Sequence, residues 1–298
     1  MGEFEKTKLR DPYIFIKADD FFKGLDSHSS GVKQPATISF QKGDQLLEDG
    51  QPNPACSHGA IFRLNDDSLL LIQFMRPRVW RIRFNPSNTK GSDFTDYNTR
   101  TIIRDTLTLL ISTLDTLEGI NWAVELIEDP RYYVLQSVMN PKTEKRQVEL
   151  QLWVQRDPFQ ITALRVLQSQ PPAEKLPELQ NHHANTASKL MFQTSKGAEA
   201  AGTATVLAIE KSVTADYMGF GEQGGKHLFK KKTYMNYFNF DNMRYQNVYG
   251  KGPLDDREPL YHSEPFWIEV DTHPGYKSQI ATFIDNYSHI CVDVGMKD

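Results

Sequence analysis

The chain has 298 residues, of which 39% are hydrophobic and 24% are charged, and its formal net charge is −4. These values are typical of a globular protein that buries a sizeable core in one large domain or two smaller ones. No sustained run of Lys and Arg is present, which argues against a nucleic-acid partner. No window approaches the ~18 consecutive apolar residues of a membrane-spanning helix, so we expect no membrane partner.

The two cysteines, Cys56 and Cys291, are far apart in the sequence, which predicts reduced, buried thiols and no disulfide framework. Adjacent His182 and His183 have no Cys, Asp or Glu at ligand spacing, so we interpret them as an exposed pair. We therefore expect no metal and no cofactor. The charged N-terminal sequence MGEFEKTKLRDPY lacks the apolar core of a secretory signal, which predicts a cytoplasmic protein.

Residues 1–58 predict an irregular N-terminal extension, because Gly, Pro, Ser and Asp recur in them. The sequence from 60 to 77 predicts a hairpin that turns at 65–67, between two apolar runs. In VWRIRF, the side chains of Trp80, Ile82 and Phe84 alternate with two arginines, as in a strand with one buried face.

The segment between residues 101 and 119 departs from this alternation. Its apolar residues recur at spacings of three and four, which predicts an amphipathic helix that ends at Gly119. The stripe consists of Ile103, Leu107, Leu110, Ile111, Leu114 and Leu117. A stripe of this kind is typical of core packing.

Alternation returns in a second hairpin, in which residues 148–154 and 159–163 form the strands and Pro158 lies in the turn. Residues 168–202 are rich in Pro, Ala, Gly and Ser, which predicts a loop excursion. Further strands are expected at 203–211, 266–270 and on both sides of a turn at 285–286. The pattern as a whole predicts a mainly β protein, a large antiparallel β-sandwich with one or two helical insertions, in a single domain over 1–298.

The stretch from Tyr217 to Phe266 has the highest density of glycines, aromatics and carboxamides in the chain. Its first part, GFGEQGG, places glycines around the lone carboxylate of Glu222. Its second part, MNYFNFDNMRYQNVY, interleaves aromatic rings with planar amides and one Asp. Rings that stack on apolar sugar faces and amides that bind hydroxyls suit a carbohydrate ligand.

No complete catalytic constellation is found in the sequence. Asp255, Asp256, Glu258 and Glu264 are close together, but Pro, Gly and Arg257 surround them, which favours a solvated turn over a glycosidase carboxylate pair. Gly-x-Ser-x-Gly is absent, and the segment after GFGEQGG is a poor helix, which argues against a dinucleotide site. We interpret these glycines as a sharp turn with positive φ angles and Glu222 as an acceptor for turn amides.

Several longer runs closely resemble the fungal α-1,4-glucan lyases of glycoside hydrolase family 31. These runs are GEQGG, MNYFNFDNMRYQ, GPLDDREPLYHSEPF and ATFIDNYS, and IQFMRPRVWRIRF followed by NTRTII agrees with them. The more general pattern of family 31 is present in Gly-x-Gly-Glu at 219–222 and in Pro-Leu-Tyr at 259–261. The resemblance covers nearly the whole chain.

This resemblance implies a galactose-mutarotase-like N-terminal β-sandwich, with the catalytic (β/α)8 barrel of the parent protein outside these 298 residues. It implies no catalytic residue in the chain. It does imply a sugar-facing loop, NFDNMRYQ, in which Asp241 accepts hydrogen bonds from a sugar hydroxyl and Asn242 and Met243 form part of the pocket wall. The implied ligand is an α-glucan such as starch, glycogen or a maltooligosaccharide, which the parent cleaves to 1,5-anhydrofructose.

Three alternatives to a sugar-binding lyase domain are left open by the residues themselves. Asp241 and Asn242 also fit an Asx-turn in a tight loop. The parent could be a hydrolytic α-glucosidase of the same family. The chain could instead be a stand-alone carbohydrate-binding β-sandwich.

Overall fold

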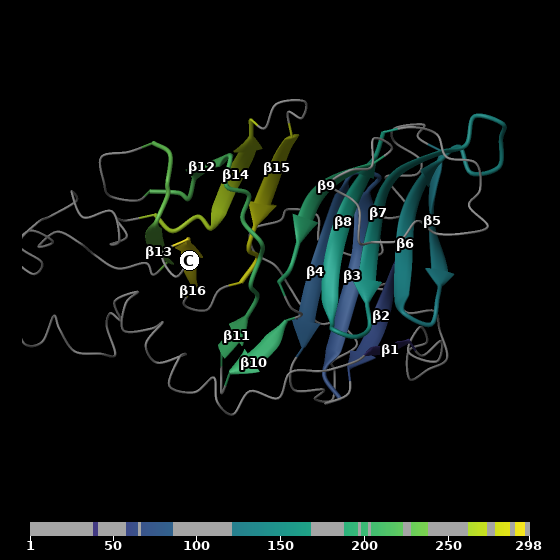
Figure 1. Ribbon diagram of the computed structural model, residues 1–298, viewed down its shortest axis with the longest axis horizontal. Helices are drawn as coiled ribbons and strands as arrows, with labels where there is room; N and C mark the ends of the chain where they lie inside the picture. Colours follow the sequence, from purple (N-terminus) through teal and green to yellow (C-terminus); the bar gives the residue numbers. More distant parts are fainter. Residues whose placement is uncertain are drawn as a thin grey trace, which may run out of the picture. The chain divides into compact units, whose positions relative to one another are not determined.

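The computed structural model describes residues 38–40, 58–64, 67–85, 121–167, 188–195, 198–201, 204–222, 228–237, 262–272, 278–286 and 290–295. All the regular elements in these ranges are β-strands, and every pair of neighbouring strands is antiparallel (Figure 1). Within the same ranges, no helix is long and apolar enough to cross a membrane. The chain divides into two compact units.

The unit formed by Gly31–Glu210 contains two main sheets. The four-stranded sheet has the order β1(Ile38–Phe40), β2(Gly59–Leu64), β3(Leu69–Arg76) and β4(Val79–Asn85). The five-stranded sheet has the order β5(Trp122–Glu128), β6(Tyr132–Met139), β7(Gln147–Gln155), β8(Gln160–Val166) and β9(Ser188–Gln193). A short pair, β10(Glu199–Ala201) and β11(Ala204–Val206), follows them.

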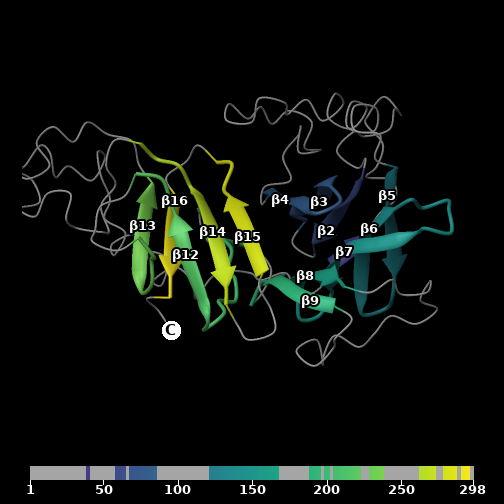
Figure 2. The same cartoon turned by 90° about the horizontal axis from the view of Figure 1, so that it is seen from above.

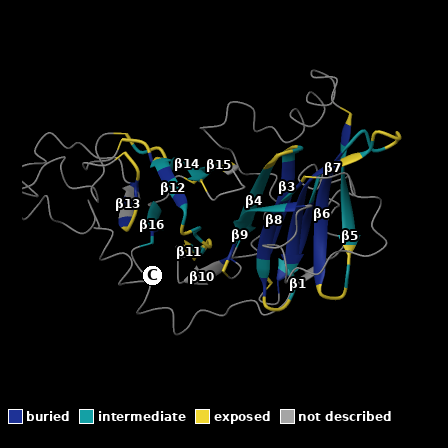
Figure 3. Ribbon diagram, turned by 45° about the horizontal axis from the view of Figure 1, so that its top comes forward, coloured by how far each residue is buried: buried dark blue, intermediate teal, exposed yellow. Residues whose placement is uncertain are grey.

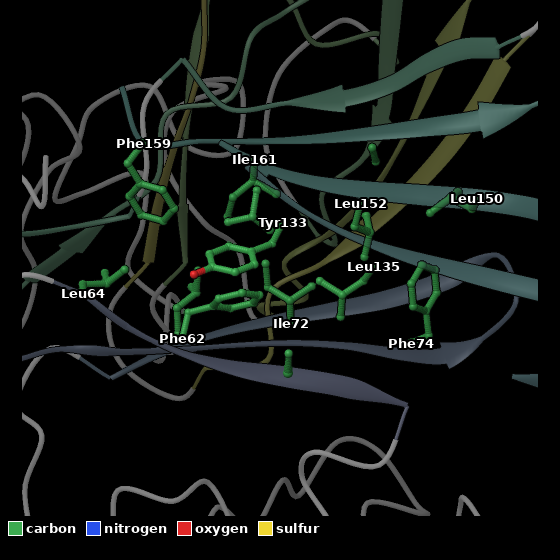
Figure 4. Packing of buried hydrophobic residues seen from close by; sticks show 14 of the residues in the cluster. Phe62, Leu64, Ile72, Phe74, Tyr133, Leu135, Leu150, Leu152, Phe159 and Ile161 are labelled. Atoms are coloured by element: carbon green, nitrogen blue, oxygen red, sulfur yellow. The ribbon is translucent and has the colours of Figure 1, made fainter. Parts of the chain in front are cut away.

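The two main sheets pack face to face as a β-sandwich, and Figure 2 shows them as two layers. Their inner side chains form one core, to which Phe62 and Ile72 come from the four-stranded sheet and Leu135, Leu152 and Ile161 from the five-stranded sheet (Figure 4). These side chains alternate along each strand with residues of the opposite face, because successive residues of a strand point to opposite sides. Burying each of them contributes roughly 1.5–3 kcal/mol.

Aromatic pairs and a charged contact join the two sheets at their margins. His58 stacks on Trp122 with ring centroids 4.4 Å apart, and Trp80 meets Phe192 edge-on at 6.2 Å. Arg78, in the turn between β3 and β4, binds the carboxylate of Glu149 on β7, with its Nε and Nη2 atoms each 2.6 Å from Oε2. The sandwich is therefore closed by side chains from both layers.

The second unit is described within Lys211–Asp298. It contains a three-stranded sheet of order β12(Ala215–Gly219), β14(Phe266–Asp271) and β15(Ser278–Phe283), and a pair formed by β13(Thr233–Tyr237) and β16(Ile290–Val294). Its buried cluster contains Ala215, Tyr217, Phe220, Met235, Tyr237, Trp267 and Val294. Figure 3 shows the buried residues on these strands and, separately, on the strands of the sandwich.

The predicted fold class, a mainly β antiparallel sandwich, is confirmed. Trp80, Ile82 and Phe84 pack on the core from β4, and the expected turn at 156–158 joins β7 to β8. Two ranges expected to be irregular contain strands: β1 lies within 1–58, and β9 and β10 lie within 168–202. The short sequence SKLMFQ could not reveal β9 by itself, because that strand forms by pairing with β8.

Two expectations on organisation stay predictions. The amphipathic helix expected at 101–119 lies outside the described residues. The single domain expected over 1–298 also stays a prediction. The chain divides into two compact units, and each of them has its own core cluster.

Candidate functional site

The stretch that suggested a sugar site lies in the second unit, and a left-handed turn is found near its start. Gly219, Phe220 and Gly221 have consecutive φ angles of 107°, 69° and 68°. A Cβ atom at position 219 would lie 2.9 Å from the carbonyl oxygen of Phe266, and one at 221 would lie 2.8 Å from the backbone nitrogen of Glu264. Backbone conformation and close packing therefore both require glycine at positions 219 and 221. The predicted positive-φ turn is confirmed.

Phe220, between these glycines, fixes the turn to β14. Its backbone N–H donates to the carbonyl of Phe266 at 2.6 Å. Its ring is fully buried and stacks on Trp267, with centroids 5.4 Å apart and planes 8° from parallel. A left-handed backbone is costly for a residue with a Cβ atom, and this stacking offsets the cost.

Glu222 connects the turn to the chain before β14. Its carboxylate Oε2 accepts a hydrogen bond from the backbone N–H of His262 at 2.8 Å, and its own N–H donates to the carbonyl of His262 at 3.3 Å. The structural role expected of Glu222 is confirmed, but the amide that its carboxylate accepts from is that of His262, forty residues from the glycine turn. Because His262 follows the segment 238–261, Glu222 holds the chain where that segment ends.

The three predicted sugar-binding residues, Asp241, Asn242 and Met243, lie outside the described residues, in the segment 238–261. That segment follows Tyr237, the last residue of β13, which pairs with Ile290 of β16. The structure therefore fixes the residues on both sides of the predicted loop, and the roles of its three residues stay predictions.

Tyr237 packs in the core of the unit. Its side chain is 3% exposed, and burial together with the negative charge of Glu264 raises the pKa of its phenol above the ordinary value of 10.0. Glu264 lies 3.7 Å from His262 Nε2 and is about half exposed. Asp255, Asp256 and Glu258, from the same acidic group in the sequence, lie outside the described ranges.

A hydrogen-bonded group around the two carboxylates of β14 was missed in the sequence. Asp271 accepts hydrogen bonds from the hydroxyls of Ser212 at 3.1 Å and Thr214 at 2.7 Å. Tyr217, which is in register with Glu269 on the neighbouring strand, bonds to its carboxylate. The available signal was the spacing of Glu269 and Asp271 in FWIEVD, which places both carboxylates on one face of a strand.

Burial dominates the protonation equilibria of this group. It raises the pKa of Glu269, although the hydrogen bond from Tyr217 acts in the opposite direction. Burial, followed by the charge of Glu269, raises the pKa of Tyr217. Both effects keep the groups neutral over a wider pH range than usual. The group resembles a structural network more than a catalytic pair, because its oxygens already bond to hydroxyls of neighbouring residues.

Metal binding finds no support in the described part of the chain, where no group of three His, Cys, Asp or Glu side chains could hold an ion. His182 and His183 lie outside it. Of the two cysteines, Cys291 is described: it lies partly buried on β16, and burial raises the pKa of its thiol to about 12.

Residues 69–293 match the family described as the glycosyl hydrolase 31 N-terminal galactose mutarotase-like domain. This match spans about three quarters of the chain and includes the glycine turn, both carboxylates of β14 and the predicted loop. The chain therefore belongs to the N-terminal galactose-mutarotase-like domains of glycoside hydrolase family 31. No curated protein matches it.

Two solved structures of a family 31 dextranase from Flavobacterium johnsoniae have a similar fold. One is complexed with glucose and shares 17% identity, and the other, a variant complexed with isomaltotriose, shares 16%. In both comparisons the TM-score is 0.54, and the alignment covers 89% of this chain and 24% of the dextranase chain. The chain thus spans about a quarter of the length of that enzyme.

Proposed function

We propose that the chain is the N-terminal β-sandwich of an α-1,4-glucan lyase-like protein and completes the sugar site of its parent. The observation that carries the proposal is the family match across 69–293, which contains the stretch from Tyr217 to Phe266 that suggested a carbohydrate ligand. The lyase-like runs in that stretch, GEQGG and MNYFNFDNMRYQ among them, favour the lyase branch. A carbohydrate ligand is further supported by the related dextranase, which is complexed with glucose and with isomaltotriose.

In this proposal the chain positions a sugar and leaves the bond-breaking steps to the parent's barrel. The carboxylate of Asp241 accepts hydrogen bonds from a sugar hydroxyl near the scissile bond, and a charged acceptor makes such bonds stronger than a neutral one. Asn242 and Met243 form the adjoining wall. The contacts of Glu222 with His262 support this arrangement, because they hold the chain where the loop segment ends.

The reaction is tested with the full-length parent protein, incubated with maltose or starch. We expect 1,5-anhydrofructose, which is released by elimination across C1–C2. Glucose as the sole product would contradict the lyase assignment and would support an α-glucosidase. A full coding sequence that does not encode a catalytic (β/α)8 barrel would contradict the proposal that the parent protein is an enzyme.

The role of Asp241 is tested in the same full-length protein with Asp241→Asn, which keeps the shape of the side chain and removes its charge. A lost hydrogen bond to a charged group is worth about 1.5–3 kcal/mol, so kcat/KM should fall roughly 10- to 150-fold. Asp255→Asn is the matched control and should leave kcat/KM unchanged. Equal activities of Asp241→Asn and the unmodified protein would contradict the assigned role.

A stand-alone carbohydrate-binding sandwich predicts a different result for the isolated 298-residue chain. In that case the chain alone would bind maltooligosaccharides as tightly as the complete protein does. Our proposal predicts a much weaker affinity, because the loop supplies one wall of a pocket. Isothermal titration calorimetry on both proteins distinguishes the two functions.

A further inference from the structure

The hydroxyl group of Tyr237 on β13 is buried without a hydrogen-bond partner among the described residues. The residue is 3% exposed, so bulk water does not replace the missing partner. Tyr217 shows the usual arrangement: it belongs to the same buried cluster, and its hydroxyl bonds to the carboxylate of Glu269. A buried hydroxyl that is left unpaired costs free energy, which makes Tyr237 a candidate donor for a ligand.

The carboxylate of Glu264 lies in the same corner of the second unit. The Glu264 backbone packs against Gly221, and the neighbouring Phe220 shares the buried cluster of Tyr237. Burial and, after it, the negative charge of Glu264 raise the pKa of the Tyr237 phenol, which agrees with this proximity. The Glu264 side chain is 54% exposed, so a solute can reach the pair from the carboxylate side.

The backbone fixes both residues in place. Tyr237 ends β13, where it is in register with Ile290 of β16. The carbonyl of Glu264 accepts from the N–H of Phe266 at 2.7 Å, and the carbonyl of Phe266 accepts from the N–H of Phe220 at 2.6 Å. Side chains that are mounted on backbone of this kind lose little freedom when they bind a ligand.

His262 leaves the carboxylate of Glu264 accessible. Its Nε2 atom lies 3.7 Å from Glu264 Oε2, which is longer than a hydrogen bond, and the two side chains are 69% and 54% exposed. Exposed pairs at this separation contribute little to stability. Glu222 directs its own Oε2 to the N–H of His262. The Glu264 carboxylate can therefore accept a hydrogen bond from a solute.

The phenol and the carboxylate together select the chemistry of a ligand. An ionised carboxylate only accepts hydrogen bonds, and a phenol without an acceptor has a proton to donate. A hydroxyl group satisfies both, because it donates to Glu264 and accepts from Tyr237. A cation offers the phenol no acceptor, and an anion is repelled by the charge of Glu264.

We propose that Tyr237 and Glu264 bind one hydroxyl group of a glucan, in addition to the predicted contact of Asp241. The proposal rests on the proposed function, which supplies a glucan as the ligand. The buried phenol then gains its partner only when the sugar is bound. A single water molecule has the same hydrogen-bonding chemistry, so the sugar and the water have to be distinguished by measurement.

Thermal unfolding of the 298-residue chain without sugar tests whether the hydroxyl is unpaired. Tyr237→Phe removes a hydroxyl that bonds to nothing, so the melting temperature should stay the same or rise. Tyr217→Phe is the matched control, because it removes a hydroxyl bonded to Glu269 and should lower the melting temperature by roughly 2–4 °C. An equal loss in Tyr237→Phe would show that the chain or a water molecule already supplies the partner, and it would overturn the proposal.

The KM of the full-length protein for maltooligosaccharides tests the sugar contact. Tyr237→Phe and Glu264→Gln should each raise KM by roughly 3- to 10-fold and leave kcat nearly unchanged, because the contact is made before and during the reaction alike. The double variant should raise KM no further than the stronger single variant, since both side chains bind the same hydroxyl. Glu128→Gln, at an exposed position of β5, is the matched control and should leave KM unchanged. An unchanged KM in Tyr237→Phe or in Glu264→Gln would overturn the proposal.

The reaction product separates this sugar contact from the proposed function. Glucose in place of 1,5-anhydrofructose would contradict the lyase assignment, while the KM values would still report on Tyr237 and Glu264. Unchanged KM values with 1,5-anhydrofructose as the product would overturn the sugar contact and leave the proposed function standing.

Discussion

The turn at Gly219, Phe220 and Gly221 has consequences that can be measured residue by residue. At Gly221 the backbone has a φ of 68°, and a Cβ atom would meet the nitrogen of Glu264 at 2.8 Å. Alanine would therefore meet conformational strain and a steric clash with backbone at the same position. The neighbouring Phe220 tolerates its left-handed backbone because its ring is stacked and fully buried.

Gly221→Ala should lower the free energy of unfolding by about 2–4 kcal/mol, from the sum of left-handed strain and overpacking. Urea unfolding measures the change. Val213→Ala is the control, because Val213 is 93% exposed and its truncation should have little effect. A loss below about 0.5 kcal/mol for Gly221→Ala would show that the turn relaxes without cost.

Glu222 should control the protection of the His262 amide, to which its carboxylate bonds at 2.8 Å. Glu222→Ala removes the acceptor and should lower the free energy of local opening by about 1–2 kcal/mol, while Glu222→Gln keeps an acceptor oxygen and should lose less. Hydrogen exchange at His262 measures both variants. Equal exchange rates in the unmodified protein and Glu222→Ala would contradict the contact.

The buried carboxyl of Glu269 makes stability depend on pH. Its pKa is raised above the ordinary 4.5, mainly by burial, so the folded state binds this proton more tightly than the unfolded state does. The stabilisation is fully present below pH 4.5 and is lost as pH rises through the folded-state pKa. Over that window this group makes the second unit less stable as the solution becomes more alkaline.

Glu269→Gln should remove this pH dependence and raise the unfolding free energy near neutral pH, because Gln stays neutral and still accepts from Tyr217. Thermal unfolding at a series of pH values gives the comparison. Glu210→Gln, a substitution at an exposed position, is the control and should retain the pH dependence. A steeper loss of stability towards alkaline pH in Glu269→Gln would reverse the predicted sign.

Among the elements, the turn between β3 and β4 acts as a clamp between the two sheets of the sandwich. Ser137 on β6 donates its hydroxyl to the carbonyl of Pro77 at 2.6 Å, and Arg78 pairs with Glu149 on β7. Glu149 lies where the pairing of β6 and β7 shifts register, between Leu150 opposite Ser137 and Val148 opposite Val138. The irregularity thus places a carboxylate within reach of the other sheet.

Removing Arg78 should leave the Glu149 carboxylate, 11% exposed, without this partner. We expect Arg78→Met to lower the free energy of unfolding by about 1–3 kcal/mol, which is less than for a fully buried pair because Arg78 itself is 58% exposed. A double-mutant cycle with Glu149→Gln measures the coupling. A coupling energy near zero would show that the clamp is not held by charge.

Element by element, alternation predicted several of the strands that bury one face on the core. The strands β4 and β7 were predicted because Trp80 and Ile82, and likewise Leu150 and Leu152, alternate with polar residues. The strands β1, β9 and β10 were not predicted, because they are short or derive their pairing from neighbours distant in sequence. No strand was predicted at β5 or β6 either, although both contribute side chains to the core. The structural role of Glu222 was correctly interpreted from its place in a glycine turn, whereas its partner His262, forty residues away, could not be predicted.

At the scale of the whole molecule, the second unit exposes large apolar side chains. Leu228 is 72% exposed and Phe229 is 45% exposed, just before three consecutive lysines. We expect the isolated chain to self-associate in a concentration-dependent way, because exposed apolar residues favour association. Analytical ultracentrifugation should show this association weakened in Leu228→Ser/Phe229→Ser. A monomer at all concentrations that does not bind the dye ANS would contradict the expectation.

The sequence by itself determined the β class of this protein, its membership of family 31 and the glycine turn, because these depend on local alternation and on short exact runs. Only the tertiary structure decided which strands pair, that Glu222 bonds to His262, and that Glu269 and Asp271 meet Tyr217, Ser212 and Thr214. The physical reason is that antiparallel pairing joins residues through backbone hydrogen bonds that any side chain permits. Contacts over forty or sixty residues therefore leave little trace in the sequence.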